Sequence, residues 1–198
     1  MKKLDLLMTG AGGQGIILAS DIIGEAAIAS GYDIKKTDAI GMAQRGGSVT
    51  SNLRIAREVW SPLIKKGEVD ILLALEKLEA ARWAYYLRPG GMAIVNNHAL
   101  PPLSVSLDNA RYPSNEEIAD ILKQRTDRIY FIDGTRRASE LGNIRTLNIF
   151  MLGCASLYMP FKVQTWKDSI SQHLPANIRQ INITAFDRGR KEMQGVRL

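Results

Sequence analysis

The sequence contains a single cysteine among its 198 residues, Cys154, which stands in the apolar segment 149–155. One thiol excludes an internal disulfide, and it excludes a zinc or iron–sulfur site built from cysteines of this chain alone. The apolar neighbours favour a buried, unreactive thiol over a nucleophile. The short apolar run that follows Met1 is broken by Asp5, so it is interpreted as a strand and not as a signal peptide. These features predict a cytoplasmic protein.

The sequence also lacks a long apolar stretch, and its few aromatic residues do not alternate with basic ones. No segment is apolar over the length that a membrane span requires, so no membrane association is expected. The net charge of +6 permits an acidic partner or a phosphorylated cofactor. However, the positive charge is dispersed and no base-stacking platform is apparent, which argues against nucleic acid as a partner.

The most informative segment is the glycine turn at residues 10–15 (GAGGQG), which follows an apolar run and precedes an uncharged helical pattern at residues 16–29 that is interrupted only by Asp21 and Glu25. Gly10, Gly12 and Gly15 have the G-x-G-x-x-G spacing in the strand–turn–helix context that gives this spacing meaning. In that context the first glycine permits a tight turn, the second lets phosphates approach the backbone, and the third lets the helix pack on the strand. Backbone N–H groups at the start of the helix would favour an anion.

The same turn can also close a β-α unit without binding anything. A dinucleotide site requires an acidic residue at the end of the second strand. The second strand is predicted at residues 32–37, and its end is basic, with Lys35 and Lys36 before Thr37. The sequence therefore counts against NAD, whereas it leaves NADP open because a 2′-phosphate is compatible with positive charge.

A second unusual segment, at residues 38–48, contains three glycines and one arginine and precedes an alternating strand pattern at residues 48–55. One interpretation is an anion pocket made by Arg45 and the N–H groups of neighbouring glycines. The other is the entry to a hairpin, with a solvated arginine. Composition alone does not separate these two interpretations.

The rest of the chain predicts an α/β protein of the Rossmann-like, doubly wound type, with a mostly parallel sheet. Residues 69–75 form an apolar run typical of a central parallel strand. Glu76 at its end could face the same crevice as Gly12 and Arg45, but the acidic start of a helix is the favoured interpretation. His98 is interpreted as a surface loop residue, and Ser114 with Glu117 matches a capping box. The whole chain, residues 1–198, is expected to form one domain, with an α/β core at 1–134 and a helical extension at 135–198.

Several of these segments together resemble one protein family. Residues 10–15, 41–49 (GMAQRGGSV), 61–76 and 88–91 are similar to the gamma-type subunit of 2-oxoacid:ferredoxin oxidoreductases. The resemblance covers essentially the whole chain, and the combination of the first two motifs is its most specific part. The form of the second motif is most similar to the small (beta) subunit of indolepyruvate:ferredoxin oxidoreductase.

The resemblance implies a role within a larger complex that decarboxylates a 2-oxoacid, passes electrons to ferredoxin and transfers the acyl group to coenzyme A. Thiamine diphosphate, Mg²⁺ and iron–sulfur clusters would belong to a larger partner subunit, because this chain lacks the motifs for them. Catalytic and metal-binding residues are accordingly not expected here. The gamma-type subunit would complete the assembly and help to bind coenzyme A, and the residues assigned to that role are Gly10, Gly12, Gly13, Gln14, Gly15, Arg45, Gly46, Gly47 and Ser48.

Two other functions remain open from the sequence. The chain could be a self-contained oxidoreductase that binds NADP or FAD, or a purely structural assembly subunit whose glycine turn binds nothing. The uncharged first helix also leaves open a homodimer of the isolated chain, in which a second copy covers apolar surface.

Overall fold

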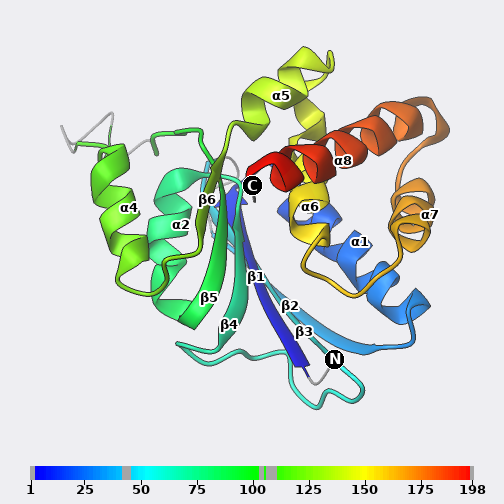
Figure 1. Ribbon diagram of the computed structural model, residues 1–198, viewed down its shortest axis with the longest axis horizontal. Coiled ribbons are helices and arrows are strands. Elements are labelled where there is room, and N and C mark those ends of the chain that lie inside the picture. Colours follow the sequence, from blue (N-terminus) through cyan, green and yellow to red (C-terminus); the bar gives the residue numbers. More distant parts are fainter. Residues whose placement is uncertain (1–2, 42–45, 103–104, 106–110, 197–198) are drawn as a thin grey trace.

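The computed structural model describes residues 3–41, 46–102, 105 and 111–196. Within these residues a six-stranded sheet with the order β2-β3-β1-β4-β5-β6 forms the centre of the molecule (Figure 1). The strands are β1 Lys3–Ala11, β2 Asp33–Ile40, β3 Ser48–Ala56, β4 Val69–Ala74, β5 Leu87–Asn96 and β6 Ile129–Ile132. The helices are α1 Ile16–Ala29, α2 Lys77–Trp83, α4 Asn115–Lys123, α5 Gly134–Glu140, α6 Leu147–Ser156, α7 Val163–His173 and α8 Ala176–Val196, with the 3₁₀ turns η1 Ala84–Tyr86 and η2 Ile144–Thr146.

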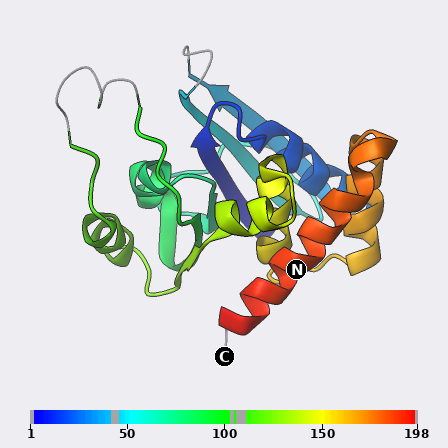
Figure 2. The same cartoon turned by 90° about the horizontal axis from the view of Figure 1, so that it is seen from above.

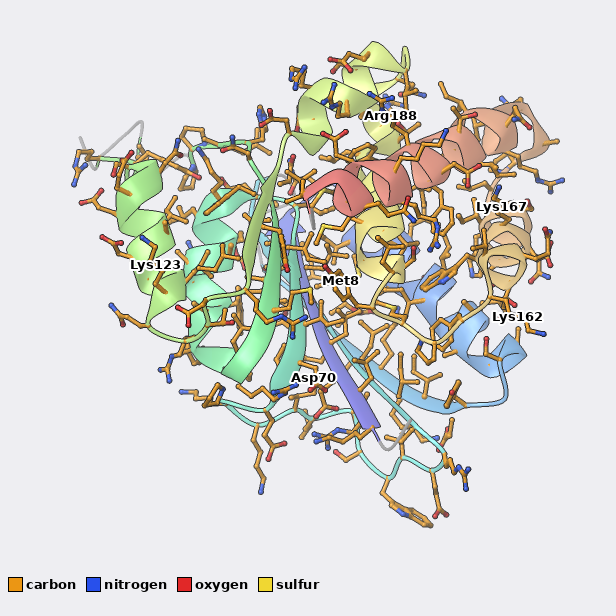
Figure 3. The ribbon with its side chains drawn as sticks, in the orientation of Figure 1. Met8, Asp70, Lys123, Lys162, Lys167 and Arg188 are labelled. Carbon is orange, nitrogen blue, oxygen red and sulfur yellow. The ribbon has the colours of Figure 1, made fainter. Side chains whose placement is uncertain are left out.

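The central strands are parallel and buried on both faces. β1 pairs with β4, β4 with β5 and β5 with β6, all in parallel. Leu6, Leu7 and Met8 are fully buried although neighbouring side chains of a strand point to opposite faces of the sheet. Figure 3 shows Met8 in the middle of β1, and Asp70 near the start of β4. The predicted α/β class with a mostly parallel sheet is therefore confirmed.

The topology near β1 differs from a simple β-α-β unit. β3 lies between β1 and β2 and is antiparallel to both, with Asn52 opposite Leu7 on one side and Thr37 on the other. The second strand also continues to Ile40 and not to residue 37, so Lys35 and Lys36 lie inside it. β3 takes this place because its alternating pattern gives one face, including Leu53, that packs against α1.

Helices cover both faces of the sheet, as the doubly wound prediction requires. α2 and α4 lie on one side, whereas α1, α6, α7 and α8 lie on the other (Figures 1 and 2). α1 packs against α7 and α6, so most of its apolar residues are covered within the chain itself, although Ile28 is 60% exposed. The need to cover the first helix therefore gives little support to a homodimer, which stays a prediction. None of the helices in the described ranges is long and apolar enough to span a bilayer.

The C-terminal helices form part of the core. The sequence predicted a helical extension over residues 135–198, and the structure has α5, η2, α6, α7 and α8 in this region. Every residue of α6 is buried, because α6 lies between the sheet and α8. A Cβ atom at Gly153 would come within 2.2 Å of the Phe186 carbonyl oxygen, so the two helices approach each other at backbone distance.

Candidate functional site

The glycine turn lies at the carboxyl end of β1, between Ala11 and the start of α1. Gly13 and Gly15 have φ values of 98° and 77°, a left-handed conformation that favours glycine. A Cβ atom at Gly13 would meet nothing within 4 Å, so the backbone there is open. The turn therefore presents accessible backbone on the side where ligands bind in open α/β sheets.

The side chain of Gln14 folds back over the turn and joins two strands. Its Oε1 accepts a hydrogen bond from the Ala11 N–H at 2.8 Å, and its Nε2 donates to the Leu75 carbonyl at 3.0 Å, where β4 ends. A Cβ atom at Gly10 would lie 2.6 Å from Gln14 Oε1. A side chain at residue 10 would therefore displace the Gln14 amide. The G-x-G-x-x-G spacing predicted a tight turn at Gly10 but not this contact.

The second glycine segment reaches the first one. The Gly12 N–H donates a hydrogen bond to the Gly47 carbonyl at 2.8 Å, and the Ser48 hydroxyl donates to Glu79 Oε2 at 2.5 Å. The two glycine segments of the sequence therefore lie against each other. The second segment also leads into β3, which forms an antiparallel hairpin with β2, as one of the two interpretations expected. Arg45 lies outside the described residues. Because the Gly12 N–H is bonded to Gly47, this group is not free for the phosphates that the spacing would let approach Gly12.

The start of α1 has the electrostatic character of an anion site. No side chain caps it, and its first turn contains no acidic residue. A cavity of about 520 Å³ opens beside it and is lined by the glycine turn, the first turn of α1, Ile40, Gly41 and Val49. Unpaired N–H groups and the helix dipole favour negative charge at such a position.

Two residues that support the turn were missed by the analysis of the sequence. Asn148 Nδ2 donates to the Gly15 carbonyl at 3.2 Å, and a Cβ atom at Gly15 would lie 2.5 Å from this amide. Glu79, buried in α2, fixes Ser48 as described. No local pattern points to Asn148 or Glu79, because both contacts join distant segments.

Glu76 has the structural role that the sequence favoured. It is the N-cap of α2, where its Oε2 accepts a hydrogen bond from the Glu79 N–H at 2.9 Å. Its other oxygen accepts hydrogen bonds from the Leu100 N–H and the Tyr112 hydroxyl. Burial, followed by the bond to Glu76, raises the pKa of Tyr112. This carboxylate therefore ties the two ends of the segment after β5 to α2.

The basic residues of β2 are not arranged for a cofactor phosphate. Lys36 forms ion pairs with Asp21 and Asp38. In addition, the antiparallel β3 lies between β1 and β2. The end of β2 is therefore not next to β1, which is the position from which a dinucleotide ribose is recognised. The geometry gives no support to NADP binding by this chain.

The fold and the site together define an α/β domain with a glycine turn before an uncapped helix start and, among the described residues, no group of three or more potential metal ligands. Over residues 5–192 the chain matches the family described as pyruvate ferredoxin/flavodoxin oxidoreductase, and it belongs to that family. It corresponds over its whole length to small subunits of 2-oxoacid:ferredoxin oxidoreductases.

Relatives of similar length support this assignment. The indolepyruvate oxidoreductase subunit IorB of Pyrococcus horikoshii is 34% identical over 194 residues, which are 96% of each chain. The subunit of the same name from Thermococcus kodakarensis is 33% identical over 202 residues, 99% of this chain and 100% of the relative.

Solved structures share the fold. The gamma subunit of the keto/oxoacid ferredoxin oxidoreductase of Geobacter sulfurreducens superposes with a TM-score of 0.71 at 21% identity and 98% coverage of both chains. The 2-oxoglutarate:ferredoxin oxidoreductase of Magnetococcus marinus, whose structure contains 2-oxoglutarate, coenzyme A and succinyl-CoA, gives a TM-score of 0.76 at 19% identity. This chain covers 32% of that one, so the fold is one part of a larger polypeptide there.

Proposed function

We propose that this chain is the non-redox small subunit of a thiamine diphosphate-dependent 2-oxoacid:ferredoxin oxidoreductase that acts on an arylpyruvate such as indolepyruvate. Its role is to complete the assembly and to help bind coenzyme A for the oxidative decarboxylation. The preference for an arylpyruvate is supported by the relatives, since several that match over most of their length are named as indolepyruvate oxidoreductase subunits.

The cysteine content supports a non-redox role. Cys154 is fully buried, its thiol donates a hydrogen bond to the Gly189 carbonyl at 3.2 Å, and burial raises its pKa. Iron–sulfur clusters are held by several thiolates, which this chain cannot supply. The clusters are therefore assigned to a larger subunit. Thiamine diphosphate and Mg²⁺, whose sequence motif this chain lacks, would be held there too, and ferredoxin would be reached through the complex.

The observation that carries the coenzyme A proposal is the hydrogen bond from Gly12 to the Gly47 carbonyl. It places the end of the 46–48 segment against the glycine turn, beside the uncapped start of α1 and the cavity next to it. Coenzyme A has several phosphate groups, which suit a helix start and an arginine. Gly13 and Gly15 would offer backbone to the cofactor, and Arg45 would supply positive charge.

Co-expression with the larger subunit tests the proposal. Viologen reduction with indolepyruvate, thiamine diphosphate and coenzyme A is expected only when both chains are present. Activity of either chain alone would refute the role of an obligate non-redox subunit, and a bound flavin or nicotinamide would favour the self-contained oxidoreductase.

Arg45→Ala in the assembled complex separates coenzyme A binding from a purely structural role. Loss of an arginine–phosphate contact is expected to raise the KM for coenzyme A about tenfold and to leave the KM for the 2-oxoacid unchanged. Arg57→Ala is the matched control, because Arg57 is an exposed arginine just beyond the other end of β3. Unchanged KM values in both variants would leave the structural role as the better account.

A further inference from the structure

A second cavity lies on the other side of the glycine turn. It has a volume of about 540 Å³ and lies among the starts of α1 and α6, the segment after β5, and η2. It shares Gly13, Gly15 and Leu18 with the first cavity, but its other walls come from different elements. Of the second glycine segment, the described residues Gly46, Gly47 and Ser48 do not line it.

The cavity is positively charged. Arg145 and His98 line it, and within the described part of the chain neither side chain has a hydrogen-bond or ion-pair partner. Among the described residues no acidic side chain lines the cavity, and the first turns of α1, η2 and α6 contain none. The cavity therefore has two cationic or hydrogen-bonding groups that the fold itself does not use.

The other polar groups of the cavity are held in place by the fold. Thr135 accepts a hydrogen bond from Asn96 Nδ2 at 2.9 Å, and Asn148 donates to the Gly15 carbonyl. Gln14 is bonded at both ends of its amide. These contacts make the walls rigid and leave Arg145 and His98 to recognise a ligand.

The remaining walls are apolar. Leu18, Leu147, Leu100 and Ile144 line the cavity, and the last two are 41% and 54% exposed. Apolar side chains left open to solvent beside unpartnered charge fit a ligand that has both characters, since binding would remove apolar surface from water.

We propose that this cavity binds a small carboxylate with an apolar body. Its polar groups, Arg145 and His98, differ from those proposed for coenzyme A, although the two sites share the glycine turn. The carboxylate accepts hydrogen bonds from Arg145 and His98, and the apolar body packs against the leucine and isoleucine side chains. An arginine suits this head group because its planar guanidinium pairs with both carboxylate oxygens. The inference does not depend on the proposed function, because it concerns groups of this chain alone.

The two histidines of the chain provide a direct test. Imidazole NMR signals of the full chain are followed during titration with phenylacetate, and His173→Gln assigns them. His173 bonds the Ser169 carbonyl within α7 and is the internal reference. The His98 signal is expected to shift with a dissociation constant on the order of 1 mM, whereas the His173 signal stays unchanged.

Variants at exposed positions complete the test. Arg145→Gln is expected to weaken binding about tenfold, and Arg125→Gln, an equal change of charge at another exposed arginine, is expected to have no effect. Ile144→Asp places a negative charge in the cavity and is expected to abolish the shift. Circular dichroism confirms that each variant is folded.

Three kinds of result would overturn the inference. The first is the absence of a His98 shift in the parent chain, or equal shifts in the parent chain and Arg145→Gln. The second is an equal response to acetate, which would show that the apolar body is not recognised. The third is a response to coenzyme A without one to phenylacetate, which would assign the cavity to the cofactor. The viologen assay remains a separate test, so failure here does not touch the proposed function.

Discussion

The side chain of Gln14 lies across Gly10 and connects the ends of β1 and β4. In an open α/β sheet the helices that follow two such strands lie on opposite faces, and ligands bind in the crevice between the strands. Here the Gln14 amide occupies part of that crevice through its bonds to Ala11 and Leu75. The residue therefore determines both the shape of the turn and how far a ligand can enter.

Gln14→Ala is expected to lower the free energy of unfolding by about 2 kcal/mol, because two hydrogen bonds are lost and the Leu75 carbonyl loses one donor. Urea unfolding followed by circular dichroism measures the change. Gln180→Ala is the control, since Gln180 is exposed on α8. Equal stability of the two variants would show that the amide does not hold the turn.

At the scale of elements, α6 and α8 approach each other at backbone distance in the core. Gly189 faces the Phe150 carbonyl and Gly153 faces the Phe186 carbonyl, so each helix offers a glycine to the backbone of the other. The Cys154 thiol bonds the Gly189 carbonyl at the same contact. Figures 1 and 2 show α8 lying across α6 at this point, and in Figure 3 Arg188 lies on α8 as well.

Gly189→Ala tests this packing. The added Cβ atom would lie 1.9 Å from the Phe150 carbonyl oxygen, so the helices must separate, and we expect a loss of about 3 kcal/mol in the free energy of unfolding. Gly195→Ala is the matched control in the same helix, because nothing lies within 4 Å of its Cβ position. It is expected to be neutral or to gain up to about 1 kcal/mol. A Gly189→Ala variant as stable as the control would contradict the close approach.

On the scale of the whole molecule, the burial of Cys154 makes this thiol a reporter of cooperative opening. It lies in a helix that contacts both the sheet and α8, so it becomes accessible only when these layers separate. Core helices open with free energies that approach the global stability of a domain.

Thiol labelling is therefore expected to be more than about 100-fold slower in the native chain than in concentrated guanidinium chloride. An Ellman's reagent time course measures both rates, and the unfolded chain should give one equivalent. Because burial raises the pKa of the folded thiol, the unfolded thiol ionises first as the pH rises. The contribution of this thiol to stability is thus present below about pH 8.5 and is lost above it. Similar rates in both states would show that α6 is not part of the cooperative core.

The sequence by itself determined the local elements of this protein. The capping box at Ser114 is present, with both of its hydrogen bonds, and the apolar run after Val69 is a buried parallel strand. The glycine turn follows β1 and precedes α1, as its spacing predicted. These features depend on residues within a few positions of each other, where hydrophobic period, caps and turn residues decide the backbone.

Only the tertiary structure decided which segments meet. The insertion of β3 between β1 and β2, the bond between Gly12 and Gly47, and the support of Gly15 by Asn148 all join distant parts of the chain, 133 positions apart in the last case. His98, interpreted from the sequence as a surface residue, lines a cavity together with Arg145. No local pattern encodes such contacts, because they follow from how the layers pack to bury apolar surface and satisfy buried polar groups.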